Sequence, residues 1–468
     1  MKAKRKSLAA ALLLMAASTR LFAADVQPLT NDQLVAQAKG LVRANTAVLM
    51  HADLALVDAK QLSDRLQAKI SKMQLPPEDE ADFKKQSAAA LEQMGKWIAA
   101  FRTAGGRQIY MTAIDERNNG GEIIIAPLEE GADGKAISGL LYSGKADGPT
   151  ADNENTFGNN KSMLRYLRSA QVVDLPSGKA VVMANRQAME LLTKQPAAER
   201  AELQPALEST GGSIAQLLVM PSSTSRATIE RQLGNNLPPP LGGGPTSALT
   251  RDIQWISVAY RSDQDQTAKA IVQCKDENAA KAAMDIYQNA TKMLLMMSAA
   301  PGQPNWAKLV GAAQPVVEGD KLTLALDDAA LDKIAPAVGF VYLEQQKTVK
   351  RMMAMSNIRQ LIQGCVMYAN DHQGVWPDKL DDVTEKYLGG NKAVLKNPAH
   401  PEMDTPFVYL KPGDVKKNPQ NRVVIYESVD AKSPYVSTGF ADGHVETLSR
   451  SQFEAKLKEA EAKEDVGL

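Results

Sequence analysis

Several features that often reveal a function are scarce in this sequence of 468 residues. It has two cysteines, four histidines and an aromatic fraction of 5%. Lysines plus arginines number 54 and aspartates plus glutamates also number 54, so no excess of charge points to nucleic acid or an anionic bilayer. The scarcity of aromatic side chains argues against stacking platforms for bases or sugars. Partners other than nucleic acid are therefore expected.

Signatures of the common enzyme classes are missing as well. The sequence has no Gly-x-Ser-x-Gly elbow, no His-Glu-x-x-His, no phosphate-binding glycine loop and no dinucleotide fingerprint. A hydrolytic triad needs a nucleophile with a histidine in reach. His51 lies on an expected strand beside Asp53, where a structural role is the better interpretation. We therefore expect no catalytic residues.

The N-terminus has the pattern of a secretory signal. A basic segment, Lys2 to Lys6, precedes an apolar run of about ten residues from Leu8 to Ala17, and Ala23 offers a cleavage point. That run is too short to span a bilayer, which takes about 20 residues. No later segment is long and apolar enough to span. The sequence predicts an exported protein, periplasmic or extracellular, with residues 1–23 removed; an uncleaved anchor is the alternative.

Residues 24–205 and 206–335 are predicted to form two related repeats of sheet plus helix. In the first repeat, a strand over 46–53 is followed by helices, paired strands, a hairpin and a short helix. The second repeats that order from a strand over 214–220. The clearest similarity between the repeats is that of residues 170–182 to residues 313–324. Each segment begins with Ala-Gln and continues with two short strand-like runs. Both repeats follow the pattern β-α-β-β-α-β-β-α, which indicates an α+β fold.

A third segment, residues 336–450, combines a helix with a small sheet. Apolar residues recur at helical spacing over 347–370, and strand candidates lie at 423–428, 435–441 and 444–448. The last two strands are joined by Asp442-Gly443, which suits a two-residue hairpin turn with positive φ. The helix near residue 360 must then be shielded by this sheet. Residues 451–468 read as a charged, solvated helix or tail.

Four short motifs in this segment carry a family resemblance. They are Ser356-Asn357-Ile358-Arg359-Gln360, Met367-Tyr368-Ala369-Asn370-Asp371, Gly374-Val375-Trp376-Pro377 and Phe440-Ala441-Asp442-Gly443-His444-Val445-Glu446. With these motifs in this order, residues 350–450 resemble the globular heads of type II secretion pseudopilin-like proteins, which end in an Ala-Asp-Gly-His-Val hairpin. Such heads are assembly and interaction modules. The resemblance therefore implies a pilin-like head with a binding role and no reaction of its own.

The segment also departs from that family. Gly339 to Glu344 echoes the prepilin peptidase site, but the residues that follow, Gln345 to Arg351, are polar and cannot enter lipid. Lys432 stands where one branch of the family has a histidine ten residues before its Asp-Gly. We therefore expect a soluble C-terminal module rather than a pilus subunit.

Two groups of side chains in the head are candidate metal ligands. Asp442, His444 and Glu446 alternate along a strand, so they can share one face that is open to a divalent metal. Alternatively, Asp442 serves the turn and the other two face solvent. Some major pseudopilin heads bind calcium near the C-terminus, and the resemblance implies that this head could do the same. The acidic candidates are Asp371, Asp378, Asp381 and Asp382. Their spacing is not that of a calcium loop, so helix capping is the alternative, and no cofactor other than calcium is considered.

The two cysteines leave their redox state open. Cys274 and Cys365 can pair in an oxidising compartment. The loop of about 90 residues would add roughly 4–5 kcal/mol in the chain-entropy model. Two buried free thiols are the alternative.

These patterns favour an exported, non-catalytic envelope protein that acts as a binding or assembly module through its head or its repeat surface. The expected partner is another envelope protein or an extracellular polymer. The interaction candidates are Trp376, Asp378, Asp442 and His444. Two alternatives stay open. One is a periplasmic metal-dependent hydrolase with its site between the repeats. The other is a carrier of lipids or small ligands, which needs an apolar cavity between sheet and helices.

Overall fold

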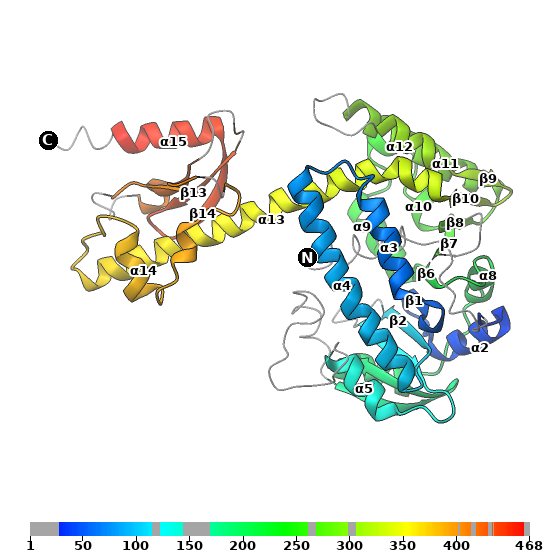
Figure 1. Ribbon diagram of the computed structural model, residues 1–468. Helices are drawn as coiled ribbons and strands as arrows, with labels where there is room; N and C mark the ends of the chain where they lie inside the picture. The colour runs from blue at the N-terminus through cyan, green and yellow to red at the C-terminus, as the bar shows by residue number, and fades with distance from the viewer. Residues whose placement is uncertain are drawn as a thin grey trace. The chain divides into compact units, whose positions relative to one another are not determined.

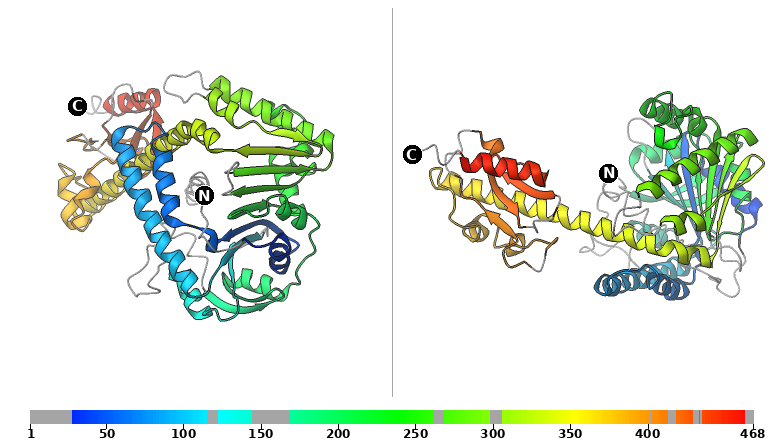
Figure 2. Two further views of the ribbon diagram at one scale, coloured as in Figure 1. Left: turned by 45° about the vertical axis from the view of Figure 1, so that its right-hand side comes forward. Right: turned by 90° about the horizontal axis from the view of Figure 1, so that it is seen from above.

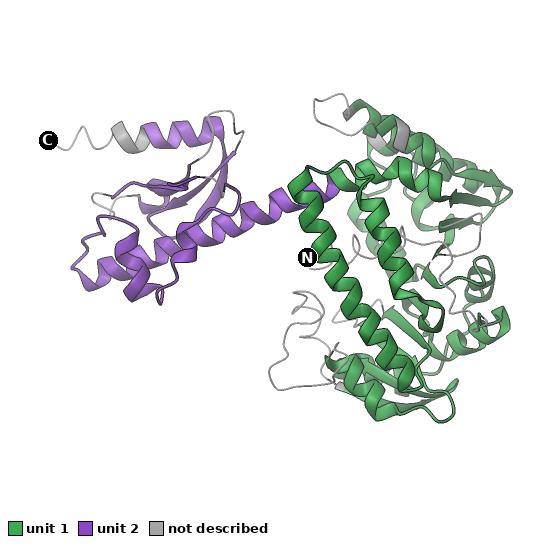
Figure 3. Cartoon of the chain, in the orientation of Figure 1, with its two compact units in different colours: residues 1–340 green, residues 341–468 purple. Residues whose placement is uncertain are grey.

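The computed structural model describes residues 28–114, 122–143, 169–260, 268–297, 306–400, 403–412, 418–428, 433 and 435–462. The expected signal segment, residues 1–23, lies outside them, as does Lys432. Figure 1 shows the helices and strands, and the chain divides into two compact units, residues 1–340 and 341–468 (Figure 3). Helices and two antiparallel sheets confirm the α+β fold class. No helix among these residues is both long and apolar enough to cross a bilayer.

Unit 1 is built on one ten-stranded antiparallel sheet that contains the strands of both expected repeats. Its order is β4-β5-β3-β2-β1-β6-β7-β8-β10-β9, so the second five strands mirror the first five. The two halves meet where β1 pairs with β6, for example Val48 with Val219. The strands are β1 (Thr46–Asp53), β2 (Gln108–Ile114), β3 (Glu122–Pro127), β4 (Ser169–Leu175), β5 (Gly178–Ala184), β6 (Ala215–Val219), β7 (Ile253–Tyr260), β8 (Ala268–Cys274), β9 (Val316–Glu318) and β10 (Lys321–Leu326).

Several helices of unit 1 begin at side-chain caps that their sequences provide. The side chain of Thr30 and that of Gln33 form a capping box at the start of α2, and the Asp58 carboxylate accepts from the backbone N–H groups of Lys60 and Gln61. The helices are α2 (Asn31–Leu41), α3 (Ala59–Ile70), α4 (Pro77–Thr103), α5 (Gly134–Ser143), α7 (Arg186–Lys194), α8 (Leu203–Glu208), α9 (Ser223–Leu233), α10 (Ser247–Thr250), α11 (Glu277–Met297) and α12 (Trp306–Ala312).

The two faces of the large sheet are covered differently (Figure 2). On one face, here termed the covered face, side chains of α2, α7 and α8 pack on the strands and bury the largest cluster of unit 1, which includes Leu49, Tyr110, Ile125, Val182 and Leu218. On the opposite face, here termed the apolar face, α4 and α5 pack against β3 and β5. At the other end of that face, α11 packs against β8 and β10. The middle of the apolar face lies between these two packed ends.

Helix α13 (Asp328–Asp371) is one helix of 44 residues, where the sequence suggested a short helix at the end of the second repeat and a separate helix over 347–370. Pro336 lies inside it. A proline in a helix interior costs about 3 kcal/mol, and the burial of Leu331, Ala335 and Ala337 around it offsets that cost. At Gly339, a Cβ atom would lie 2.2 Å from the carbonyl oxygen of Met73, so only glycine allows this approach to the end of α3.

Unit 2 is a small antiparallel sheet with the order β11-β12-β13-β14, packed against the C-terminal half of α13. Ile358, Leu361, Ile362 and Cys365 on α13 bury their side chains with Val424 and Ile425 of the sheet. The expectation that the helix near residue 360 is shielded by the last strands is therefore correct. The elements are β11 (Phe407–Tyr409), β12 (Val423–Glu427), β13 (Tyr435–Phe440), β14 (Val445–Ser449), α14 (Asp381–Tyr387) and α15 (Arg450–Ala462).

The loop between β13 and β14 differs from the expected two-residue turn. The N–H of Gly443 donates to the carbonyl of Phe440, and the N–H of Phe440 donates to the carbonyl of His444. Within this loop, only Gly443 has a positive φ, at 91°. The connection is therefore a three-residue loop, Ala441 to Gly443, with glycine in the left-handed position, the next most common hairpin connection.

The C-terminal helix is also more than a solvated end. Phe453 of α15 is 4% exposed and packs with Val423, Val436, Phe440 and Leu448, with Leu457 beside them. The charged side chains thus occupy one side of α15, while its apolar side covers the small sheet. Two apolar residues one helical turn apart, Phe453 and Leu457, are enough to attach this otherwise charged segment to the sheet.

Replacing Gly439 should test the contact between α13 and the small sheet. A Cβ atom at this position would lie 2.2 Å from Cδ1 of Ile362 and 2.7 Å from Cγ2 of Ile358. We expect Gly439→Val to lower the stability of unit 2 by about 2 kcal/mol through overpacking. Hydrogen–deuterium exchange of peptides from β12 to β14 measures unit 2 separately from unit 1. Thr447→Val, at an exposed position of the same sheet, should have little effect. Equal exchange in the two variants would contradict this packing.

Candidate functional site

The β13–β14 loop brings together the three ionisable residues that the sequence singled out. The Nδ1 atom of His444 contacts the carboxylate of Asp442, and its Nε2 atom lies 3.4 Å from Oε1 of Glu446. The imidazole stacks on the ring of Phe440, with ring centroids 4.3 Å apart. About a third of the His444 and Asp442 side chains is exposed (34% and 33%), and half of the Glu446 side chain (50%).

Both ring nitrogens of His444 therefore face carboxylates of its own hairpin. Burial alone would raise the pKa of Asp442, but hydrogen bonds from the side chain and backbone of His444 outweigh it, so the pKa is lowered. Among the residues that the structure describes, no three His, Cys, Asp or Glu side chains are grouped to hold a metal ion. The arrangement is a local ion network, and it gives no support to a metal bound by Asp442, His444 and Glu446.

The acidic candidates for calcium make separate contacts, and Asp371 pairs with Lys386 at 2.9 Å. Asp378 is 86% exposed and pairs with Lys411 at 2.5 Å. The carboxylate of Asp382 accepts a hydrogen bond of 3.2 Å from the backbone N–H of Lys379. Asp381 is exposed in the first turn of α14, where a negative charge interacts favourably with the helix dipole. Helix α14 begins after Leu380 without a side-chain cap, so these contacts bear out neither the capping alternative nor a calcium loop.

One further expectation needs correction, and one open alternative can be decided. Trp376 is 5% exposed and belongs to the core of unit 2, so it cannot serve as a surface contact. Cys274 and Cys365 are both free and buried, Cys274 in unit 1 and Cys365 in unit 2. Each thiol packs in its own hydrophobic cluster, which fits the alternative of two buried thiols rather than a disulfide.

The covered face of the large sheet contains an unusual group of buried polar side chains. His51 of β1 lies between Tyr110 of β2 and Gln216 of β6 in the strand register. The hydroxyl of Tyr110 contacts the Oε1 atoms of Gln37 and Gln108 at 2.8 and 2.9 Å. Four buried atoms of this group have no hydrogen-bond partner among the described residues. They are both ring nitrogens of His51, Oε1 of Gln216 and Nε2 of Gln108. Buried polar atoms without partners cost about 1–3 kcal/mol each, so this group lowers the stability of the sheet.

The apolar face holds the feature that the sequence did not identify. Six residues in register across six strands, here termed the central row, are Met111, Met50, Leu217, Val258, Ala270 and Leu324. The rows on either side are apolar except for Tyr260 at the end of β7. Every member of the central row is half-buried, whereas the covered-face residues that alternate with them in β1, β2 and β6 are fully buried.

Partial exposure of these apolar side chains is costly. Apolar surface left in water forfeits about 25 cal/mol for each Å². The packed helices cover β3 and β5 and, in the row next to the central row, Val272 of β8 and Leu322 of β10, while each residue of the central row stays half-buried. Contiguous apolar surface of this kind marks a ligand-binding or interaction site more often than scattered exposed residues do. The central row is therefore the candidate binding site of unit 1.

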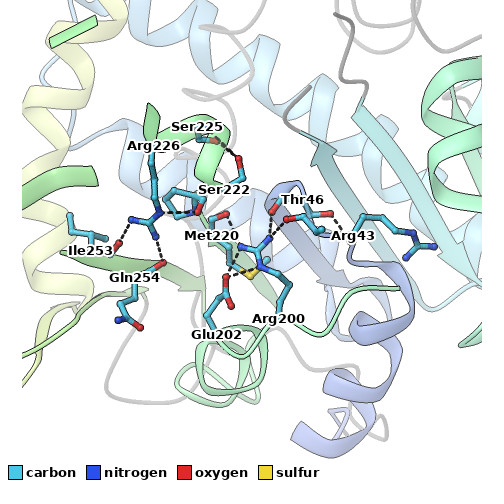
Figure 4. Close-up of polar contacts among 12 residues, drawn as sticks. Arg43, Thr46, Arg200, Glu202, Met220, Ser222, Ser225, Arg226, Ile253 and Gln254 are labelled. Atoms are coloured by element: carbon cyan, nitrogen blue, oxygen red, sulfur yellow. Dashed lines mark hydrogen bonds and ion pairs between the residues drawn. The ribbon is translucent and has the colours of Figure 1, made fainter. Parts of the chain in front are cut away.

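The arginines near the junction of the two halves have a structural role (Figure 4). Arg200 donates to the carbonyls of Ala44 and Thr46 at 3.0 Å and to that of Met220 at 3.2 Å, and it pairs with Glu202. Arg226 donates to carbonyls beside the start of β7, including those of Ile253 and Gln254. Because backbone carbonyls use these guanidinium groups, the cluster fixes strand ends and does not form an anion site.

Comparison with known proteins gives little information about function. No family model matches the sequence, and no curated protein matches it. Among solved structures, crystal form I of TP0453 is similar at 12% identity and a TM-score of 0.25, covering 68% of this chain and 99% of that chain. Crystal form III of TP0453 gives 12% identity, a TM-score of 0.25, and 67% and 99% coverage. Likeness at this TM-score carries no argument about the present protein.

The sequence contained one signal for the apolar face. Strands with one buried and one solvated face alternate between apolar and polar residues, whereas β6 reads Ala-Gln-Leu-Leu-Val and β1 contains Ala47-Val48-Leu49-Met50. Such runs show that both faces are apolar. They do not show which face is fully buried, because that depends on where the helices pack.

The buried histidine predicts a specific pH dependence of stability. Burial lowers the pKa of His51 from 6.5 to about 4; the nearby side chain of Gln108 partly opposes this shift, and the charge of Arg107 adds to it. Between these values the unfolded chain binds more protons, so stability is full above pH 6.5 and falls as the pH drops toward 4. His51 should contribute a loss of about 2 kcal/mol between about pH 7 and pH 5.

Urea unfolding of the wild type and His51→Gln at both pH values measures this contribution. We expect the loss on acidification to be smaller in His51→Gln, while His372→Gln, at an exposed position, should behave as the wild type. An identical loss in the His51→Gln protein would contradict the assignment of a buried neutral imidazole.

The two thiols should be unreactive in the folded protein. Burial raises the pKa of Cys274 to about 11, to which Asp252, Asp320 and Asp276 contribute, and burial raises that of Cys365 to about 12. We expect iodoacetamide to label neither cysteine in the native protein and both after unfolding without reductant. A disulfide-linked peptide in a non-reducing digest would contradict this expectation.

Proposed function

We propose that this protein is an exported, non-catalytic binding protein that holds an elongated apolar ligand on the apolar face of unit 1. The observation that carries the proposal is the central row, six half-buried apolar side chains in register across six strands. Among the alternatives derived from the sequence, the carrier of lipids or small ligands fits this row best.

The continuity of the sheet supports a carrier over a hydrolase between the repeats. Because β1 pairs with β6, backbone hydrogen bonds occupy the junction of the two halves, where the hydrolase hypothesis placed a cleft. The side chains along this junction on the apolar face are Val48, Met50, Leu217 and Val219, which offer neither a nucleophile nor a base. Such a surface can bind through burial of apolar area, and it has no group for chemistry.

The head keeps its proposed role as a docking module. Exposed large apolar side chains of unit 2 support this, and they are Val341, Met353, Met367, Val375 and Tyr435. The exposed parts of Asp442, His444 and Glu446 add a polar surface at the hairpin loop. The proposed partner is another envelope protein or an extracellular polymer, as the resemblance to pseudopilin-like heads suggests.

Binding of an uncharged apolar dye tests the proposal for unit 1. We expect the chain that starts at Ala24 to bind Nile red with enhanced fluorescence, and Leu217→Glu to weaken binding about tenfold or more, because the carboxylate would have to be desolvated. Ala270→Phe tests the same row without adding charge and should also weaken binding, by filling space. Val316→Glu, at an apolar residue of β9 that is 58% exposed, should bind as the wild type. Circular dichroism checks the fold of each variant. Equal binding by all four proteins, or by none, would contradict the proposal.

A further inference from the structure

Helices α3 and α13 carry a charged group with unused hydrogen-bonding capacity. Arg65 of α3 donates through NH2 to the Asp328 carboxylate at 2.8 Å, and Lys69 lies 3.5 Å from Asp328 and 2.5 Å from Asp332. The other terminal nitrogen of Arg65, NH1, is buried and has no partner among the described residues. Gln61, one turn earlier on α3, likewise has a buried Oε1 atom without a partner.

This charged group adjoins the apolar face at Tyr260. In the strand register, Tyr260 of β7 lies beside Ala215 of β6 and Ala268 of β8, in the row next to the central row. Arg65 and Asp328 both lie close enough to the Tyr260 hydroxyl to act on its pKa, Arg65 lowering it and Asp328 raising it, although burial has the largest effect and raises it. The spare guanidinium N–H groups are thus placed where the polar end of an apolar ligand would lie.

The chemistry of this end selects an anion. An unsatisfied buried donor costs about 1–3 kcal/mol, and more where the group is charged. A guanidinium presents parallel N–H groups that match a carboxylate, and such charge-assisted bonds are the stronger ones. The charges of this group already balance, because the two cations Arg65 and Lys69 face the two carboxylates of Asp328 and Asp332. A singly charged head therefore fits better than a doubly charged phosphate monoester.

The apolar face is also long enough for an acyl chain. Tyr260 lies on β7, the fourth of the six strands of the central row, so from there to β2 the row covers three spacings of about 4.8 Å, or roughly 14 Å. One acyl chain occupies roughly half of the ~30 Å hydrocarbon core of a bilayer. From Tyr260 toward β2, the central row can therefore hold an acyl chain of about this length lying across the strands.

We propose that the ligand of unit 1 is a long-chain fatty acid, with its carboxylate bound by Arg65 beside Tyr260 and its acyl chain on the apolar face. This inference rests on the proposed carrier function and adds the identity of the polar head. Arg65 then acts as the residue that determines specificity, and the central row supplies affinity without selecting the head.

Competition between two ligands that differ only in their heads tests the inference. Hexadecanoate and hexadecanol are titrated against the complex of Nile red with the chain from Ala24, at pH 8 and low salt, where the carboxyl is ionised. We expect hexadecanoate to displace the dye at about tenfold lower concentration than hexadecanol. In Arg65→Met, hexadecanoate and hexadecanol should displace the dye at about the same concentration, so that the ratio falls to about one. The concentration of hexadecanol needed should stay as in the wild type.

Two variants control for the loss of a positive charge and for misfolding. Arg186→Met removes an arginine whose side chain is 92% exposed, so the preference for hexadecanoate should remain. Arg65→Lys keeps the charge and the ion pair with Asp328, and we expect it to keep part of the preference. The wild-type comparison decides the question even where Arg65→Met does not fold.

The outcomes separate this inference from the proposed function. If both ligands displace the dye equally from the wild type, the fatty-acid assignment is wrong and the carrier function stands. If Nile red does not bind the wild type at all, the carrier function fails first. Tighter competition by hexadecyl phosphate than by hexadecanoate would overturn the choice of a carboxylate head.

Discussion

The antiparallel pairing of β1 with β6 is the interaction on which the rest of unit 1 depends. It joins two five-stranded halves into one sheet and places Met50 of the first half beside Leu217 of the second. The same pairing sets His51 opposite Gln216 on the covered face. Because successive residues of a strand point to opposite faces, one register fixes both the apolar row and the polar group behind it. Arg200 and Arg226 reinforce this junction by bonding carbonyls at the ends of β1, β6 and β7.

Local patterns in the sequence were sufficient to predict most of the elements. The strand expected over 46–53 is β1, and the hairpin expected near 170–184 is β4 with β5. The helix near residue 360 and the sheet that covers it were also found from apolar spacing. Where the prediction failed, tertiary contacts overrode a local signal. The short helix that closes the second repeat and the apolar helix over 347–370 proved to be one helix, α13, and the charged tail proved to bury Phe453.

Neighbour relations between strands were beyond a single sequence. Nothing in the residues of β5 says that it inserts between β3 and β4, since any of several strands with the same alternation would fit. The half-covered central row depends on where α4, α5 and α11 end on the sheet, which is a property of three helices at once. The orphan nitrogen of Arg65 depends on the position of Asp328, more than 250 residues later in the chain. The candidate site therefore had to come from the structure.

The mirrored strand order also constrains how the chain can be divided. In a fragment that ends before β6, β1 would become an open edge with unpaired N–H and C=O groups, and in a fragment that begins at β6, that strand would be the edge. Open edges are templates for pairing with another chain. In the whole protein this edge of β1 pairs with an antiparallel strand, β6. Two copies of the first half can therefore pair through β1 about a two-fold axis. Either half alone should thus self-associate, and the linear fusion of the halves protects both edges within one polypeptide.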